Sequence, residues 1–285
     1  MKIILHIHPN GRYAQKFIEP LREVERGFGY LSLMVNALYS KPTDDKINLS
    51  LSKSNFLKLP FNIIIFFLYI YRIKPDIIIA HNSTFASLPL FICKLLRVKK
   101  RIYFNHGIPF IAYSGILKKI LYLFEKINCL FSTEIITVSQ AMKKILLEIS
   151  SKNISIISNG SSCGIDLDDP AYLKEDKRSL RNNMGFRSDD KIILFVGRPN
   201  KRKGFYDIIK VWNKYFILNP NFKLILLGIS KSDILKFYDK IPNNIFPMTF
   251  ITNPEKFFLI SDYLLVTSYH EGLNYSVIEA MISNT

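Results

Sequence analysis

The chain of 285 residues has few cysteines and no apolar run long enough to cross a bilayer. Its three cysteines, Cys93, Cys129 and Cys163, are scattered and lack CxxC spacing, so neither a disulfide framework nor a zinc site is implied. Such cysteine usage is typical of a reducing cytoplasm. The most apolar stretch, Phe61–Tyr71, falls well short of the roughly 20 residues of a transmembrane helix, and we expect a buried helix there. Met1–Pro9 has one basic residue and a short apolar run, which predicts a first strand and not a signal peptide.

Acidic residues are also few, because 23 Asp and Glu stand against 39 Lys and Arg, for a formal net charge of +16. A charge of this size suggests an anionic partner such as nucleic acid, acidic lipid headgroups or a phosphorylated substrate. An AT-rich genome, which favours Lys, Ile, Asn and Phe codons, would instead make part of the excess a general solvated surface. Composition alone leaves both explanations open.

Short β-branched runs alternate with longer helical patterns over the first 158 residues. This alternation predicts a parallel sheet with helices on both faces, and the strands are continuously apolar, as expected when both faces are covered. Helical patterns lie near 12–26, 54–72, 84–96, 115–131 and 139–150. The predicted strands are Ile3–Ile7, Ile77–Ala80, Arg101–Asn105, Glu134–Val138 and Ile154–Ile157.

After residue 158 a turn-rich segment and a charged stretch, 174–187, interrupt the pattern, which then starts again. We therefore predict two Rossmann-like α/β domains, 1–170 and 171–285, with the boundary inside 166–188. The second domain offers about four strands and stops inside its last helix, so we expect it to be incomplete through C-terminal truncation. Its predicted strands are Lys191–Val196, Lys223–Leu227, 249–251 and Tyr263–Val266, and its predicted helices are 204–219, 231–238 and 254–260.

Two glutamates eight positions apart, Glu271 and Glu279, are the most informative feature of the chain. Glu271 precedes Gly272 in a turn after a strand, and Glu279 lies on an apolar helix. A strand, a glycine turn and a helix bring backbone N–H groups and a positive helix end to an anionic ligand, and acidic residues bind sugar hydroxyls. A solvent-facing helical position is the alternative for Glu279, although its apolar neighbours argue against it.

A basic loop, Gly197–Gly204, also follows a strand and precedes a helix. Ligands of open α/β sheets bind beyond the carboxyl ends of the strands, where Arg198 and Lys203 would provide phosphate contacts. Taken alone, such a loop could be a solvated surface turn. Its position one strand away from the glutamate motif favours a binding site for a diphosphate.

These two motifs resemble those of the retaining glycosyltransferases of family 4, which have the GT-B architecture of two Rossmann-like domains. The resemblance extends over essentially the whole chain, through Lys74-Pro75-Asp76…His81, Asn105-His106-Gly107 and Thr137-Val-Ser139. The segment Asn159–Asp166 is similar to one in members that build capsular and other surface polysaccharides, where Asn commonly stands in the place of Cys163.

The resemblance implies a role for each matching residue. Arg198 and Lys203 would hold the donor diphosphate, Glu271 would contact the donor sugar and Glu279 would bind the ribose. His106 would lie near the reaction centre, although a structural histidine at a strand end is the alternative. Backbone groups at the helix start would face the phosphates, and a glycine after the first strand would contact the acceptor; these residues are Gly272, Leu273, Asn274 and Gly11.

The resemblance therefore implies transfer of a sugar, with retention, from a UDP- or GDP-linked donor to an acceptor that is either linked to polyprenyl diphosphate or another carbohydrate. No other cofactor is expected and we assign no metal, since the spacing of His6, His8 and His81 does not make them metal ligands. The basic residues of the first half suit peripheral binding to the anionic inner face of the cytoplasmic membrane. One alternative is a truncated protein that binds nucleotide-sugar without turnover. Another is nucleic-acid binding, which no helix-turn-helix, zinc or RNA-sheet signature supports.

Overall fold

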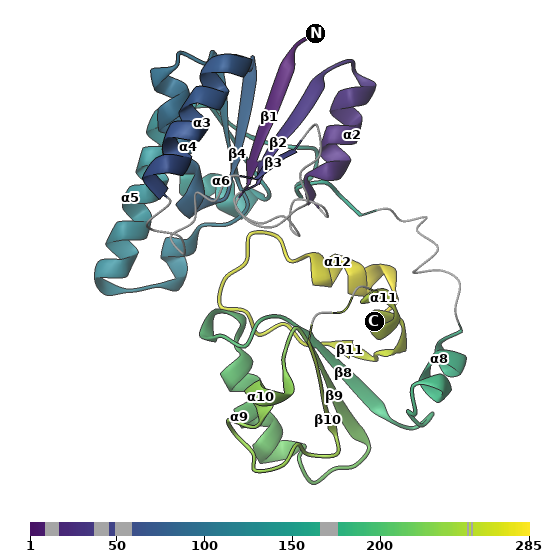
Figure 1. Ribbon diagram of the computed structural model, residues 1–285. Coiled ribbons are helices and arrows are strands. Elements are labelled where there is room, and N and C mark those ends of the chain that lie inside the picture. The colour runs from purple at the N-terminus through teal and green to yellow at the C-terminus, as the bar shows by residue number, and fades with distance from the viewer. Residues whose placement is uncertain (9–16, 37–45, 49–58, 166–175, 250, 252) are drawn as a thin grey trace. The chain divides into compact units, whose positions relative to one another are not determined.

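The computed structural model describes residues 1–8, 17–36, 46–48, 59–165, 176–249, 251 and 253–285 (Figure 1). The chain divides into two compact units, Met1–Gly164 and Ile165–Thr285. The boundary predicted between residues 170 and 171 lies outside the described residues, as does Gly11. Each unit is an α/β domain, as predicted.

The first unit contains a fully parallel seven-stranded sheet in the order β3-β2-β1-β4-β5-β6-β7. The strand order reverses between β1 and β4, and the ligands of doubly wound sheets bind beside such a point. The strands are β1 (Ile3–His8), β2 (Leu31–Asn36), β3 (Lys46–Asn48), β4 (Ile77–His81), β5 (Lys100–Asn105), β6 (Glu134–Thr137) and β7 (Ile154–Ile156).

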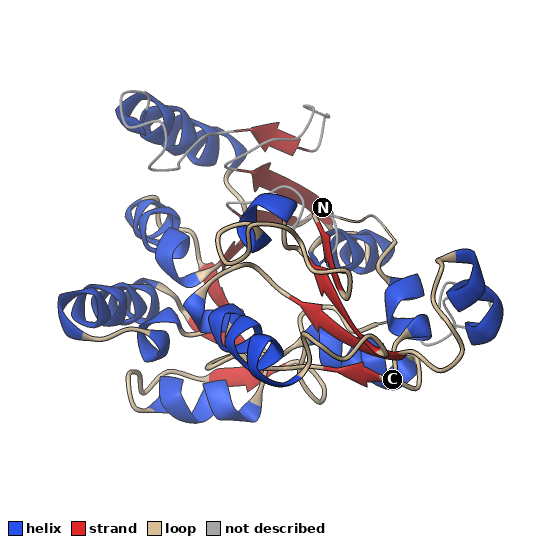
Figure 2. Cartoon of the chain, turned by 90° about the horizontal axis from the view of Figure 1, so that it is seen from below, coloured by secondary structure: helices blue, strands red, loops and turns tan. Residues whose placement is uncertain are grey.

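Helices cover both faces of this sheet, so its central strands are buried on both sides (Figures 1 and 2). Helix α2 packs over β1 and β2 on one face, while α3, α4 and α5 lie on the other (Figure 1). The helices are α2 (Glu19–Gly27), α3 (Leu59–Ile73), α4 (Ser83–Leu95), the 3-10 helix η2 (Pro109–Ala112), α5 (Gly115–Phe131) and α6 (Gln140–Leu147).

The second unit has a parallel four-stranded sheet in the order β10-β9-β8-β11. Two separate apolar clusters cover its faces, one built with α9 and α10 and the other with α8, α11 and α12. The strands are β8 (Lys191–Val196), β9 (Phe222–Leu227), β10 (Ile245–Met248) and β11 (Tyr263–Leu264). The helices are α8 (Lys177–Asn183), η3 (Lys201–Lys203), α9 (Phe205–Tyr215), α10 (Lys231–Ile234), α11 (Glu255–Ile260) and α12 (Tyr275–Ile282).

Most predicted elements are confirmed within a few residues, but the structure also departs from the prediction. The strand predicted at 249–251 is wrong, because β10 ends at Met248 and contains Pro247, which a strand at the edge of the sheet, beside β9, tolerates. Strands β2 and β3 were not predicted. The charged stretch that suggested a linker holds α8, whose N-terminus is capped by the side chain of Asp176 accepting from Ser179 N at 2.8 Å.

The apolar run Phe61–Tyr71 forms helix α3, as predicted, but the expectation that it is buried is only partly met. Phe66 and Ile70 are buried in the core, whereas Phe61, Ile64 and Leu68 are exposed. One side of the helix thus packs on the sheet and the other is accessible to solvent. Across the described part of the chain, every helix falls short of the length or hydropathy needed to cross a membrane.

Candidate functional site

The carboxyl ends of β8 and β11 carry the two sequence motifs. These strands are neighbours in the second sheet, so the loops that follow them meet. The Thr267 hydroxyl donates to the carbonyl oxygen of Lys203 at 2.9 Å, and Tyr269 N donates to that of Arg202 at 2.9 Å. The contacts are close because Gly204 has φ +68° and lacks a side chain; a Cβ there would lie 2.2 Å from the Thr267 carbonyl oxygen.

Three charged side chains converge at this junction. Lys203 Nζ lies 2.5 Å from Glu271 Oε1, and Arg202 Nη1 lies 3.5 Å from Glu271 Oε2 and donates to His270 O at 3.0 Å. Burial would raise the pKa of Glu271, but hydrogen bonds from Lys203 and Ser268 and the two cations outweigh it and lower the pKa. The site therefore holds an ionised carboxylate between two fixed cations.

The sequence identified Lys203 and Glu271 correctly as neighbours but missed Arg202. Residues 201–203 form the short 3-10 helix η3, which begins where the Asn200 side chain accepts from Lys203 N at 3.0 Å. That turn directs the second and third of three consecutive basic residues toward Glu271. The side chain of Arg198 is exposed, directly after Gly197 at the end of β8. Nothing in the sequence distinguishes Arg202 from Arg198 as the second basic residue of the loop that contacts the glutamate.

Helix α12 starts directly after this junction. The Asn274 side chain caps it by accepting from Ser276 N at 3.2 Å, and Gly272 and Leu273 form the turn that precedes it. In its first turn, Val277 N donates to the carbonyl oxygen of the same Asn274 at 3.1 Å, so the N-cap residue satisfies two of the N–H groups that a helix N-terminus leaves without intrahelical partners. Glu279 follows one turn into the helix and is buried, so the expectation that it does not face solvent is confirmed.

His106 of the first unit joins a cluster of histidines. In register, His6 of β1 pairs with Ile79 of β4, and His81 of β4 pairs with Phe104 of β5. Side chains two residues apart share a face of a sheet, so His6, His81 and His106 all point to the face covered by α2. His6 Nδ1 lies 3.0 Å from His81 Nε2, and His81 Nδ1 lies 2.8 Å from His106 Nε2.

These separations are those of hydrogen bonds between rings and are shorter than the distance expected between two nitrogens bound to one metal ion. Two nitrogens bound to one tetrahedral zinc, each at about 2.0–2.1 Å, would lie about 3.3 Å apart or more. Among the residues that the structure describes, no group of three or more His, Cys, Asp or Glu side chains could hold a metal ion. Asp166 and Asp168 have Asp-x-Asp spacing but lie outside the described residues.

On the opposite face of β5, a buried carboxyl group supports the turn at His106. Glu125 of α5 accepts from Tyr103 Oη at 2.9 Å, from Asn105 Nδ2 at 3.4 Å and from the Ser83 hydroxyl. Asn105 Oδ1 in turn accepts from Gly107 N at 3.1 Å. Burial raises the pKa of Glu125 to about 7, against the hydrogen bonds that lower it. The sequence indicated no role for Glu125.

The fold and these two clusters define a pair of α/β domains with polar clusters at the ends of their sheets, and both domains match known families. Residues 40–164 match Glycosyltransferase Family 4, and residues 176–285 match Glycosyl transferases group 1. The chain thus carries these two glycosyltransferase domains in succession, and its fold is that of GT-B glycosyltransferases.

Individual relatives are distant. Over 100 residues (34% of this chain), the chain is 31% identical to an uncharacterized glycosyltransferase of Methanocaldococcus jannaschii, and over 120 residues (40%) it is 25% identical to alpha-monoglucosyldiacylglycerol synthase of Acholeplasma laidlawii. The matched segments span only 25% and 30% of these two relatives. The crystal structure of Anabaena Alr3699/HepE in complex with UDP and glucose superposes with a TM-score of 0.75 at 16% identity, covering 99% of this chain and 78% of that one.

Proposed function

We propose that the protein transfers a sugar, with retention of configuration, from a nucleoside-diphosphate donor to a carbohydrate acceptor. The observation that carries the proposal is the Lys203–Glu271–Arg202 cluster, which lies at the carboxyl ends of two neighbouring strands and beside a helix N-terminus. A fixed pair of cations beside a carboxylate is suited to a substrate that has a diphosphate on one side and sugar hydroxyls on the other.

Each group has a role in this proposal. Lys203 and Arg198 hold the diphosphate, together with the backbone N–H groups that follow Gly272, and stabilise the charge that develops as the leaving group departs. Glu271 accepts from hydroxyls of the donor sugar, and Glu279 from those of the ribose. His106 acts near the donor sugar, as the family resemblance implies. The bond from the anomeric carbon to the phosphate oxygen breaks while the acceptor oxygen bonds to the same face of the sugar.

The ion pair between Lys203 and Glu271 would change when the donor binds. The carboxylate of Glu271 neutralises Lys203 at 2.5 Å. An incoming diphosphate would compete for that ammonium group and free carboxylate lone pairs for sugar hydroxyls. UDP is the first donor nucleotide to test, since the Anabaena homologue of similar fold binds UDP and glucose; GDP is the second.

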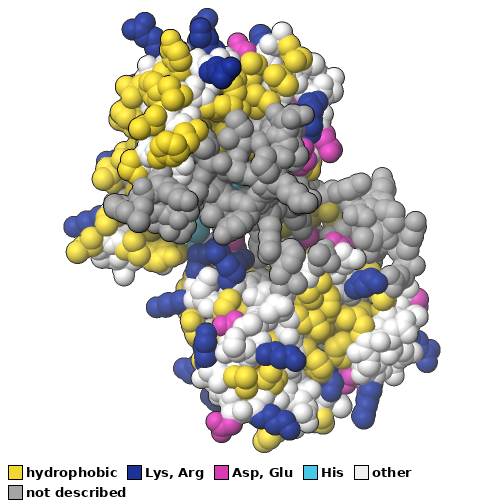
Figure 3. Space-filling model, viewed as in Figure 1, with side chains coloured by type: hydrophobic (Ala, Val, Ile, Leu, Met, Phe, Trp, Pro, Cys, Tyr) yellow, Lys and Arg dark blue, Asp and Glu magenta, His cyan; other side chains and the backbone are white. Residues whose placement is uncertain are grey.

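We further propose that the acceptor is a lipid-linked sugar of surface polysaccharide biosynthesis and that the first unit binds an anionic membrane surface from the cytoplasmic side. Helix α5 supports this, because Ile116, Ile120 and Leu123 are exposed next to Lys118 and Lys119. Hydrophobic side chains gather over the α3, α4 and α5 side of this unit, with Lys and Arg nearby (Figure 3). An apolar face bordered by basic residues is typical of helices that lie on a bilayer. The name of the Acholeplasma relative, a monoglucosyldiacylglycerol synthase, is consistent with a lipid acceptor.

The experiment is to measure binding and transfer with UDP- and GDP-linked sugars, in wild type and in Lys203→Ala, Glu271→Gln and Arg198→Ala. Loss of a contact to the diphosphate or to a sugar hydroxyl should lower kcat/KM about tenfold to a few hundredfold, equivalent to ~1.5–3 kcal/mol. Lys201→Ala is the matched control, because Lys201 is exposed in the same short helix. Unchanged transfer in all three variants would refute the assigned site. Donor binding without transfer by wild type would reduce the function to binding.

A further inference from the structure

The buried histidines of the first unit form a continuous hydrogen-bonded chain that the proposed roles do not use. The nitrogens of His6 and His81 approach to 3.0 Å while their ring centroids stay 5.3 Å apart, and those of His81 and His106 approach to 2.8 Å with centroids 5.1 Å apart. The rings therefore meet edge to edge. One end of the chain is the Glu25 carboxylate, both oxygens of which lie 3.0 Å from His6 Nε2, and the other end is the Ser162 hydroxyl, 2.8 Å from His106 Nδ1.

The carboxylate end determines which nitrogen of every ring carries the proton. Burial would raise the pKa of Glu25, but hydrogen bonds from His6 and Ser32 and the charge of Arg22 lower it, so Glu25 is ionised and can only accept. His6 must donate from Nε2, and in its neutral form its Nδ1 accepts from His81 Nε2. In the same way, His81 donates from Nε2 and accepts at Nδ1 from His106 Nε2. His106 Nδ1 then accepts from the Ser162 hydroxyl.

A second arrangement of protons satisfies the same atoms. If His6 carries protons on both nitrogens, its Nδ1 donates to His81 Nε2, His81 donates from Nδ1 to His106 Nε2, and His106 donates from Nδ1 to Ser162. The two arrangements differ by one proton, which enters at His106 Nδ1 and appears as charge on His6. No heavy atom has to move between them.

The surroundings favour charge at the His6 end of the chain. Burial lowers the pKa of His106 to about 3 and, together with the neighbouring histidines, lowers that of His81. A proton on His6 instead faces the Glu25 carboxylate, whose side chain is 17% exposed and can exchange with water. The charged and titratable groups around the chain are Glu25 and Arg22 on α2 and His8, His81 and His106 on the strand ends.

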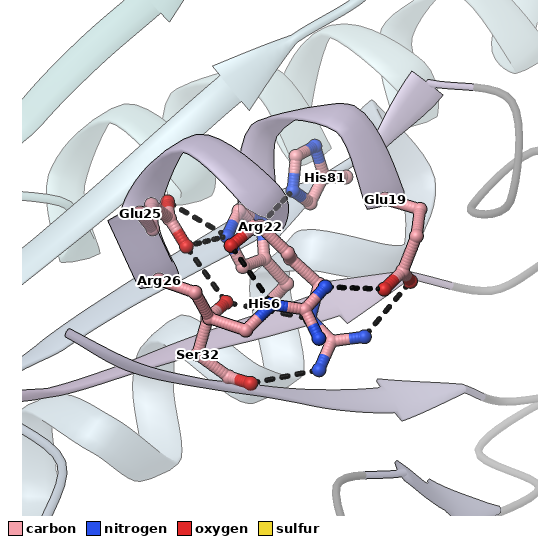
Figure 4. A network of polar contacts seen from close by, with 7 residues as sticks. All are labelled: His6, Glu19, Arg22, Glu25, Arg26, Ser32 and His81. Atoms are coloured by element: carbon pink, nitrogen blue, oxygen red, sulfur yellow. Dashed lines mark hydrogen bonds and ion pairs between the residues drawn. The ribbon is translucent and has the colours of Figure 1, made fainter. Parts of the chain in front are cut away.

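Helix α2 holds the carboxylate in place (Figure 4). The buried guanidinium of Arg22 donates to the Ser32 carbonyl at 2.7 Å and to its hydroxyl at 3.3 Å, and that hydroxyl donates to Glu25 Oε2 at 2.7 Å. Glu19 on the same helix pairs with Arg22 at 2.9 Å and with Arg26 at 2.7 Å. The helix thus carries two carboxylates: Glu25 accepts from the histidine chain, and Glu19 pairs with two arginines.

We propose that Glu25, His6, His81, His106 and Ser162 form a proton relay for a substrate hydroxyl that binds at the Ser162 end. The Ser162 hydroxyl is the last group of the chain at this end. The O–H bond of the substrate breaks and its electron pair stays on oxygen, which becomes the nucleophile of the transfer. The substrate proton bonds to Ser162 Oγ, and the proton that Ser162 carried passes to His106 Nδ1. The Nε2 proton of His106 then passes to His81 Nδ1, and that of His81 passes to His6 Nδ1. The imidazolium of His6 then pairs with Glu25. This inference rests on the proposed sugar transfer for its substrate, but its proton arrangement can be measured without any substrate.

The first test is long-range ¹H–¹⁵N NMR of the histidine rings in the full chain. We expect the Nε2–H tautomer at His6, His81 and His106 near neutral pH. The Nδ1–H tautomer at His81 or His106 would overturn the relay. Glu25→Gln gives His6 an amide, which can donate as well as accept, in place of a carboxylate that can only accept, so this variant should no longer hold the three rings in one tautomer order. Glu19→Gln should leave the tautomer order unchanged, and equal ¹⁵N spectra of the two variants would also overturn the proposal.

The second test uses whichever donor the wild type transfers. Glu25→Gln should lower kcat on the order of 100-fold, because His6, which accepts the proton, loses the carboxylate that stabilises its charged form, and should leave the donor KM unchanged, while Glu19→Gln stays near wild type. A Glu25→Gln enzyme with wild-type kcat would refute the relay. If wild type transfers no sugar, the proposed function fails, whereas the NMR result still decides whether the relay exists.

Discussion

Replacement of Gly204 by Ala tests how the two loops of the second unit are held together. Gly204 has φ +68°, which costs an L-residue roughly 1–2 kcal/mol. A Cβ would also lie 2.2 Å from the Thr267 carbonyl oxygen and 2.6 Å from the Thr267 Cβ and Oγ1. Because backbone and side chain would both have to shift, overpacking should add about 1–3 kcal/mol.

Gly185→Ala is the matched control, since Gly185 has φ +79° and a Cβ added there would meet nothing within 4 Å. Gly185→Ala should lower the free energy of unfolding by roughly 1–2 kcal/mol, which is the cost of the positive φ alone. Both variants are compared with wild type by urea denaturation of the whole chain and by titration with UDP. We expect Gly204→Ala to be the less stable of the two and to bind donor nucleotide more weakly, because the shift moves Lys203 away from Glu271. Equal stability of the two variants, or normal nucleotide affinity in Gly204→Ala, would refute this reasoning.

Two further predictions concern the first unit. Burial raises the pKa of Glu125 to about 7, so its contribution to stability is fully present below about pH 4.5 and is lost as the pH rises through about 7. Glu125→Gln should remove up to ~3 kcal/mol of this pH dependence of the free energy of unfolding. Identical curves of stability against pH for the variant and wild type would contradict the prediction. The side chain of Ile116 is 77% exposed, so Ile116→Ser should weaken binding to anionic vesicles about tenfold without lowering the stability of the protein. Sedimentation with anionic and with neutral vesicles would show whether binding needs both apolar and charged contacts.

The sequence predicted the central strands of the two sheets better than the strands at their edges. Strands such as Lys191–Val196 are continuously apolar because both of their faces are covered, and the pattern is visible without knowledge of the fold. Strand β10 was misplaced because Pro247 argues against a strand unless its edge position is known. The exposed side of α3 was missed for a related reason. An all-apolar run does not reveal which of its residues face the core, since that depends on the neighbours that cover it.

The candidate site was only partly predictable. Lys203 and Glu271 could be proposed as neighbours because each ends a strand-to-helix loop, and ligands of parallel sheets bind at that edge. Arg202 and the closure of the loops through Thr267 depend on the path of η3 and on the missing side chain of Gly204. The sequence did not reveal the role of Glu125, because its buried hydrogen bonds join helix and strand positions that are far apart in sequence.

Local patterns of burial and turn formation were enough to specify the alternation of strands and helices, the two-domain organisation and the residue types at the strand ends. The histidine chain is different, because His6, His81 and His106 come from three different strands and meet edge to edge beside Glu25 only in the folded protein. Their meeting depends on the register of β1, β4 and β5, which places the three rings on one face, each two residues further along its strand than the residue paired with the previous histidine. A shift by one residue in either pairing would send a ring to the opposite face and break the chain.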